Sequence, residues 1–281
     1  YKDLSGFAKD VTVVGNYAYV ADFEKGLVII DVSDPTSPGS PVYMDTNGQP
    51  NGVTVEGNYA YVADSASGLA IINISDPTSP GTPVYKDTSG SAKGITVVGN
   101  YAYVADAETG LAIIDISDPT NPGTLVYEDT SGSSMDVNVV GNYAYMAVGS
   151  SGLAIIDVSD PTSPGTPVYM DTSGYTYSVT VVGNYAYLGD GDSGLAIINV
   201  SDPISPGNLV YKSTTASTHD VNVVGDYAYV VVDISGLAVI PLNIGLIQDA
   251  ALNDATLTLA SPGDANSLGT NKAIVIDTTP P

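Results

Sequence analysis

The sequence predicts an all-β protein, a six-bladed β-propeller. The first observation is a 42-residue repeat, in which the glycine of a Gly-Asn-Tyr or Gly-Asp-Tyr turn recurs at Gly15, Gly57, Gly99, Gly141, Gly183 and Gly225. The second observation is that each repeat contains short apolar segments separated by turn residues. A period near 40 residues with four strands in each unit is typical of β-propellers.

The repeat that begins at Gly94 shows the expected elements in order. Its four strands are expected at residues 95–98, 101–105, 111–117 and 125–129. The third strand is apolar over most of its length, which is typical of a strand buried on both faces. In blade one the strands are expected at residues 11–14, 17–21, 27–33 and 42–46, and later blades follow at steps of 42 residues.

The N-terminus predicts how the ring closes. Residues 1–9 match residues 85–93, which cover the fourth strand of a repeat, and the sixth repeat loses the pattern after Ile240. We therefore expect the N-terminal strand to be the outer strand of blade six. Such a strand would remove an exposed sheet edge and lock the ring.

Two segments carry a resemblance to a known family. The sequences GLAIIDVSDPTSPG (152–165) and GNYAYVAD (57–64) resemble those of LVIVD-repeat propellers of bacterial secreted and cell-surface proteins. The resemblance covers residues 1–241, which we take as the propeller domain. It implies a propeller fold and an extracellular or bacterial cell-surface location beside other surface domains, and it implies no single activity.

Residues 242–281 do not repeat and are treated as a C-terminal tail. Residues 255–260 and 272–277 look like strands, and the ending VIDTTPP is similar to junctions between immunoglobulin-like modules. Three interpretations stay open. The tail begins an immunoglobulin-like module, it docks on the propeller, or it donates strands to a neighbouring molecule and so mediates self-association.

Composition excludes several classes of partner. Seven Lys and Arg residues against 31 Asp and Glu residues give a formal net charge of −24. Nucleic acid needs clustered basic residues, so it is not expected as a partner. The sequence contains no apolar run long enough to span a bilayer, so membrane insertion is not expected. The lack of cysteine excludes disulfides and thiolate metal sites.

Comparison of the repeats predicts one variable loop face. The Gly-Asn turns and the SDPTSPG loops are nearly constant and share the opposite face, whereas the other loops vary. All aromatic residues outside the repeat pattern fall on the variable face: Phe7, Phe23, Tyr175 and Tyr177. Exposed aromatic residues are common anchors of binding surfaces, so this face is expected to bind a partner. Drift in loops under little constraint is the alternative.

Six equivalent residues precede the first strands and are expected to ring the mouth of the central channel: Lys9, Asn51, Lys93, Met135, Tyr177 and His219. They predict a pocket for an anionic or sugar group, with polar contacts from Lys and His and stacking on Tyr177. The next position holds Asp10, Asp136 and Asp220, and oxygen ligands converging on an axis suit Ca²⁺. Alternatively, these Asp side chains cap backbone amides.

These observations predict a non-enzymatic extracellular binding module that recognises a glycan, peptide or surface partner. No paired carboxylate, activated nucleophile or metal-ligand motif accompanies His219, so catalysis is not expected. Ca²⁺ is the one cofactor the sequence suggests. A structural repeat, filament or spacer subunit of a bacterial surface assembly is the alternative function.

Overall fold

The computed structural model describes residues 4, 6–233 and 235–242, and these residues form six antiparallel sheets and no helix. The expected all-β propeller fold is confirmed. The residues described include no helix that is long and apolar enough to cross a membrane.

The sheets are the blades, in chain order. Blade one comprises β1 (Ala8–Val14), β2 (Tyr17–Asp22), β3 (Gly26–Asp31) and β4 (Val42–Met44). Blade two comprises β5 (Gly52–Glu56), β6 (Tyr59–Ala63), β7 (Leu69–Asn73) and β8 (Val84–Lys86). Blade three comprises β9 (Ala92–Val98), β10 (Tyr101–Asp106), β11 (Gly110–Asp115) and β12 (Leu125–Glu128).

Blade four comprises β13 (Asp136–Val140), β14 (Tyr143–Ala147), β15 (Leu153–Asp157) and β16 (Val168–Met170). Blade five comprises β17 (Ser178–Val182), β18 (Tyr185–Gly189), β19 (Leu195–Asn199) and β20 (Leu209–Lys212). Blade six comprises β21 (Thr218–Val224), β22 (Tyr227–Val232) and β23 (Gly236–Pro241).

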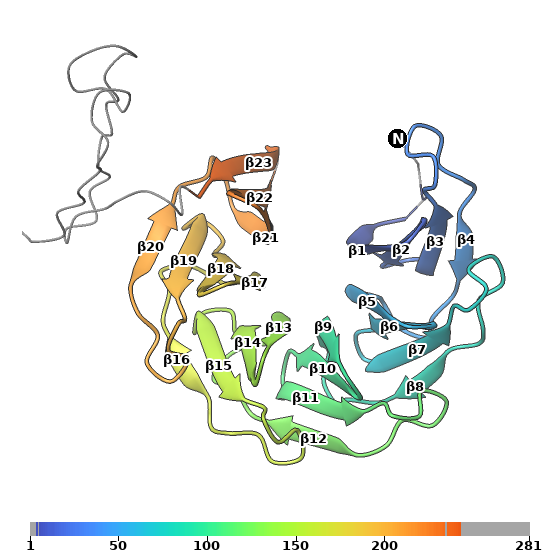
Figure 1. Cartoon of the computed structure of the whole chain (residues 1–281), viewed down its shortest axis with the longest axis horizontal. Coiled ribbons are helices and arrows are strands. Elements are labelled where there is room, and N and C mark those ends of the chain that lie inside the picture. Colours follow the sequence, from blue (N-terminus) through green and yellow to red (C-terminus); the bar gives the residue numbers. More distant parts are fainter. Residues whose placement is uncertain (1–3, 5, 234, 243–281) are drawn as a thin grey trace, which may run out of the picture.

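Each blade is a simple meander in which successive strands pair, with the first strand nearest the central axis and the last at the rim (Figure 1). The outer strands are shorter than the sequence predicts, since β4 ends at Met44 whereas the expected segment ran to residue 46. Some inner strands are longer, and β1 extends back to Ala8 through a bulge between Ala8 and Asp10. The start of the inner strand therefore reaches the mouth of the channel.

The Gly-Asn turns make the repeat locally regular. The glycine that starts each turn has a φ of 57–60° in all six blades. A Cβ atom at Gly15 would meet nothing within 4 Å, so the turn requires glycine for its left-handed backbone and not for space. The first two strands of every blade are thus set by local conformation.

The core lies between blades. Tyr19, Leu27 and Ile29 of blade one pack with Val53, Val62 and Ile72 of blade two in one buried cluster. Equivalent clusters join each later pair of neighbours up to blades five and six. Each buried Leu or Ile side chain contributes about 1.5–3 kcal/mol, so these five joints supply most of the apolar stabilisation.

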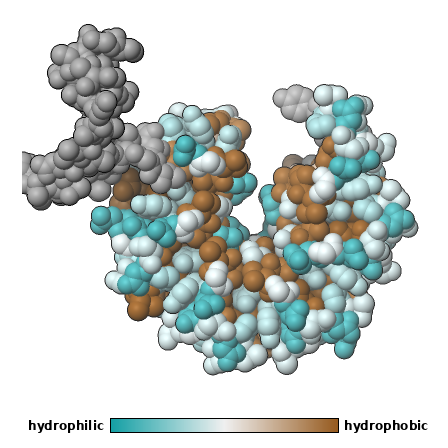
Figure 2. Space-filling view, in the orientation of Figure 1, coloured by the Kyte–Doolittle hydropathy of each residue, from teal (hydrophilic) through white to brown (hydrophobic). Residues whose placement is uncertain are grey.

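The expected closure of the ring by the N-terminus is not confirmed. Blade six has three strands among the described residues, and a notch separates it from blade one (Figure 2). Leu4 packs on the blade-one cluster of Ala18, Val20, Val28 and Ile30. Residues 1–3 lie outside the described residues, and so do residues 243–281, on which the expectations for the tail depend.

Candidate functional site

A cavity of about 180 Å³ lies where the first strands of the six blades converge. The six residues expected at the channel mouth all line it, as do the three carboxylates that follow them: Lys9, Asn51, Lys93, Met135, Tyr177, His219, Asp10, Asp136 and Asp220. Gly52, Gly94, Ile95 and Ser178 complete the wall. The structure therefore brings these predicted residues together, while ligand binding by them stays a prediction.

Backbone pairing places these side chains at the mouth. The N–H of Asn51 donates to the carbonyl of Ala63 at 2.8 Å, and Met135 and Tyr177 make the equivalent bonds to Ala147 and Gly189. Each residue is thereby held at the end of the second strand of its own blade. Variation from blade to blade at this position changes the lining of the cavity without changing its framework.

Aromatic side chains form a continuous run along one side of the mouth. The ring centroids of Tyr175 and Tyr177 lie 4.9 Å apart, and those of Tyr177 and His219 lie 4.7 Å apart. The hydroxyl of Tyr175 reaches the Sδ of Met135 at 3.6 Å. A Cβ atom at Gly149 would lie 2.8 Å from the Tyr175 ring, so the glycine makes room for the tyrosine. The run extends from blade four to blade six.

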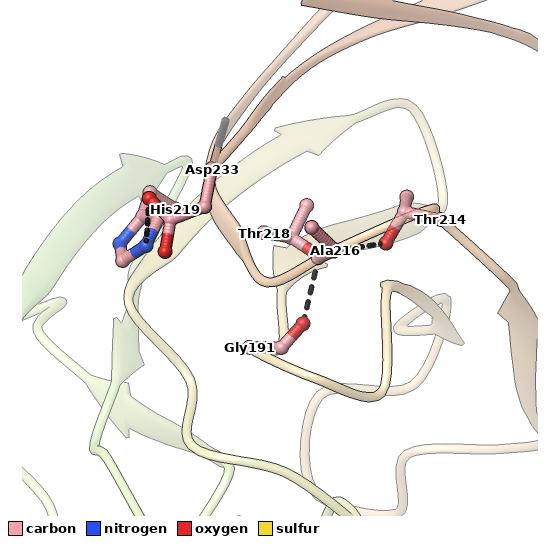
Figure 3. A network of polar contacts seen from close by, with 6 residues as sticks. All are labelled: Gly191, Thr214, Ala216, Thr218, His219 and Asp233. Atoms are coloured by element: carbon pink, nitrogen blue, oxygen red, sulfur yellow. Dashed lines mark hydrogen bonds and ion pairs between the residues drawn. The ribbon is translucent and has the colours of Figure 1, made fainter. Parts of the chain in front are cut away.

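His219 stands at the end of this run and faces Asp233 (Figure 3). Nε2 of His219 lies 3.1 Å from Oδ1 of Asp233, which is an ion-pair separation, but the two groups are not aligned as a hydrogen bond. The preceding Thr218 is buried, and its hydroxyl donates to the Gly191 carbonyl at 3.0 Å. This bond anchors the start of β21, which carries His219, to the adjacent hairpin of blade five.

Phe7 and Phe23 form a separate group on blade one. Phe7 is 64% exposed, and its carbonyl accepts the N–H of Phe23 at 2.9 Å. Nζ of Lys9 lies 5.4 Å from the centroid of the Phe23 ring, within cation–π range. The four predicted aromatic residues therefore fall into two groups, and of the four only Tyr177 lines the cavity.

The carboxylates at the cavity wall bond to backbone amides. Asp10 accepts the N–H of Val53 at 2.8 Å, and Asp136 accepts the N–H of Val179 at 3.0 Å, so each links its blade to the next. Burial raises the pKa of Asp136 to about 8, with a further contribution from the charge of Asp220 and against the effect of its amide bonds. Burial also raises the pKa of Asp10 and of Asp220.

The described part of the chain holds no group of three or more His, Asp or Glu side chains arranged to ligate a metal. The amide bonds of Asp10 and Asp136 instead follow the alternative interpretation, in which these side chains cap backbone N–H groups. Ca²⁺ binding by Asp10, Asp136 and Asp220 stays a prediction.

Comparison with known proteins agrees with this architecture. The family model of the LVIVD repeat matches residues 5–46, 47–84, 89–128, 131–172, 173–214 and 216–241. The chain belongs to the LVIVD-repeat family. No curated protein matches it.

Solved structures similar to this LVIVD-repeat chain share its fold at low identity. A computationally designed protein, Ika8, has a TM-score of 0.64 and 10% identity over 91% of this chain and 78% of its own. The β-propeller domain of Myceliophteria thermophila Cps50 (Swd1) has a TM-score of 0.64 and 13% identity over 82% of this chain and 81% of its own. At these identities the likeness concerns the fold alone.

The LVIVD repeats also place a buried carboxylate in a structural role that the sequence did not predict. Asp190 is fully buried at the end of β18 and accepts bonds from the hydroxyls of Thr172 and Thr176 and from the N–H of Gly174. Asp64 makes the equivalent bonds to Thr46 and Gly48. These clamps hold the variable loops between blades. The recurring Asp after the second strand, paired with a Thr in the preceding loop, is the signal that predicts them.

Ser178 is a second residue that the sequence did not single out. It lines the cavity, is 5% exposed, and its hydroxyl has no hydrogen-bond partner among the described residues. A Cβ atom at Gly189 would lie 2.7 Å from this hydroxyl oxygen, so the hydroxyl is buried against the neighbouring strand β18.

Proposed function

We propose that this LVIVD-repeat propeller is a non-enzymatic, extracellular binding module that recognises a protein on a cell or molecular surface through its variable loop face. The observation that carries the proposal is the run Tyr175–Tyr177–His219 beside the central cavity. Aromatic side chains at the edge of a concave site are the usual anchors of protein recognition. Loops positioned by a rigid scaffold are where such residues concentrate.

The size of the cavity supports a macromolecular partner. Its volume is about 180 Å³, whereas small-molecule sites usually measure about 300–1,000 Å³. A space of this size accepts one side chain or one ring. The rest of the partner would then lie across the surrounding loops, where Phe7, Phe23 and Tyr175 are available to it.

The polar groups of the cavity support insertion of a hydrogen-bonding group. Lys9 and Lys93 contribute cations to its lining. Burial raises the pKa of all three carboxyl groups in the lining, that of Asp136 to about 8, which weakens their repulsion of an anionic group. A terminal sugar is the second candidate for this space, because the Tyr177 ring at its edge is a stacking platform.

The test compares binding by three forms of the protein. Wild type, the double variant Tyr175→Ser and Tyr177→Ser, and the control Ile204→Ser are applied to surface-protein extracts and to a glycan array. Ile204 serves as the control because it is an apolar side chain, 70% exposed, in one of the nearly constant loops of the opposite face.

We expect the double variant to lose at least tenfold in affinity for a protein in the extract, while the control binds like wild type. Binding to glycans and to no protein would instead support a terminal sugar as the ligand. Equal binding by all three forms would contradict the assignment of binding to the variable loop face. Melting temperatures measured alongside distinguish lost contacts from lost folding.

A further inference from the structure

Basic side chains are scarce in this protein, and they concentrate at the central cavity. The chain has seven Lys, no Arg and one His against 31 acidic residues. Six of these basic residues lie in the described part of the chain, and half of them line the cavity: Lys9, Lys93 and His219. In a molecule with a formal net charge of −24, such a concentration of cations indicates a local site for an anionic group.

The two lysines of the cavity are not engaged by carboxylates. The one ion pair among the described residues joins His219 to Asp233, so neither Lys9 nor Lys93 is paired with an acidic side chain there. Nζ of Lys9 lies 5.4 Å from the centroid of the Phe23 ring, and such a contact is weak at an exposed site. Both ammonium groups are therefore free to bind a stronger partner.

The mouth of the cavity has two unlike sides. Blades one and three contribute Lys9 and Lys93, and Asn51 of blade two lies between them in the order of the blades. Blades five and six contribute Tyr177 and His219, whose ring centroids lie 4.7 Å apart. A ligand with an anionic end and a short apolar stem fits this arrangement, because its charge meets the lysines while its stem packs on the rings.

Three carboxyl groups share the cavity and limit the charge that it accepts. Asp10 and Asp136 each accept two backbone N–H groups, one of them from the next blade. Burial raises the pKa of Asp10, Asp136 and Asp220, which reduces the negative charge of the lining. Beside two lysines, such a lining tolerates the single charge of a carboxylate better than the double charge of a phosphate group.

We propose that the cavity binds a carboxylate of the protein partner, in which Lys9 and Lys93 donate to the carboxylate oxygens and Tyr177 covers the carbon stem. This inference rests on the proposed binding function and adds the chemistry of the group that enters the cavity. An Asp or Glu side chain and a C-terminal carboxylate offer the same chemistry, and a cavity of about 180 Å³ accommodates either one. Charge-assisted hydrogen bonds are roughly twice as strong as neutral ones, so the lysines select the residue that is inserted.

His219 provides a direct reporter of the cavity, because it is the only histidine of the chain and lines the site. Its ring resonances are followed by NMR at constant pH while small probes are added. The first probe is N-acetylglutamic acid methylamide, and the second is the uncharged glutamine counterpart, which has the same shape. The third is N-acetylalanine, which carries a C-terminal carboxylate. Inorganic phosphate is the fourth.

We expect a carboxylate probe to shift the His219 resonances with a dissociation constant of about 1 mM, and the glutamine counterpart to leave them in place. A shift by the glutamate probe alone assigns the site to an acidic side chain, and a shift by N-acetylalanine alone assigns it to a C-terminus. Equal shifts by the glutamate and glutamine probes would overturn the proposal. So would a shift by phosphate with none by either carboxylate, or no shift at all.

Paired variants show whether the lysines bind the probe. The test variant is Lys9→Gln with Lys93→Gln. The matched control is Lys86→Gln with Lys212→Gln, which removes the same charge from the outer strands β8 and β20. We expect the test variant to bind the carboxylate probe more weakly by about tenfold or more, and the control to bind it like wild type. Equal weakening in both would show an effect of overall charge only and would refute the carboxylate site.

The same two variants are applied to the surface-protein extract, beside the Tyr175→Ser and Tyr177→Ser variant. A partner that is lost with the tyrosines and kept with the Lys9 and Lys93 variant would leave the proposed function standing and would refute this inference. A carboxylate site that is found by NMR while the tyrosine variant binds the extract like wild type would refute the proposed binding face and leave the site itself standing.

Discussion

Blades five and six have nearly the same repeat, yet blade five is packed on both faces and blade six on one. Tyr187 and Tyr229 occupy the same position in the two blades, and their exposed fractions are 1% and 37%. Blade five also has a buried clamp at Asp190, where blade six has Val232. The comparison shows that the repeat specifies each strand, whereas the neighbouring blade decides what the strand buries.

The largest expected effect concerns these two tyrosines. Tyr187→Ala should lower the free energy of unfolding by about 3–5 kcal/mol, because it leaves a cavity in a packed joint. Tyr229→Ala should cost clearly less, about 1 kcal/mol, because its side chain is 37% exposed and no neighbouring blade covers it. Chemical denaturation of the two variants measures both values. An equal cost at the two positions would contradict the difference in burial.

The next-largest expected effect concerns the buried Asp190 clamp, which blade five has and blade six lacks. Asp190→Ala should cost about 2–4 kcal/mol, because it removes a buried acceptor and leaves two hydroxyls and one N–H of the preceding loop without their partner. Blade six lacks this clamp, and Val232→Ala removes only two methyl groups at the same position. We expect Val232→Ala to cost clearly less. Thermal unfolding of the two variants compares them, and equal losses would show that the clamp contributes nothing beyond packing.

A third prediction concerns Asp136 of blade four and the pH dependence of the protein's stability. The pKa of Asp136 is raised to about 8 in the folded protein, from an ordinary value of 3.8. The folded state therefore binds the proton more tightly, and its stability falls as pH rises between these two values. Relative to wild type, Asp136→Asn should gain about 1–3 kcal/mol between pH 5 and pH 9, after allowance for solvent at the cavity. A difference that does not change with pH would contradict the raised pKa.

The smallest difference is expected at the turns. Gly183→Ala and Gly225→Ala should each cost about 1–2 kcal/mol, because both glycines have a left-handed backbone that alanine adopts with strain. The cost should be the same in blade five and blade six, since nothing lies within 4 Å of either position. Unequal values would mean that the neighbouring blade influences the turn as well as the face.

The site was predictable in position but not in detail. Equivalence between repeats was enough to place Lys9, Lys93 and His219 around one channel mouth. The stacking of Tyr177 against His219 joins blade five to blade six, and the pairing of His219 with Asp233 joins β21 to the hairpin after β22. No local pattern encodes these contacts. The unpaired hydroxyl of Ser178 likewise depends on which neighbours surround it.

Sequence by itself determined the number of blades, the order of strands and the turns of this protein. These features follow from short-range effects: the period of apolar residues, the left-handed glycine and the breaks at proline. Only the tertiary structure decided that Tyr187 is buried and Tyr229 is not, that Asp136 holds a proton near neutral pH, and that a notch separates the end blades. Each of these depends on how five successive joints place one blade against the next. These properties therefore depend on contacts around the whole ring, and the sequence of a single 42-residue repeat does not determine them.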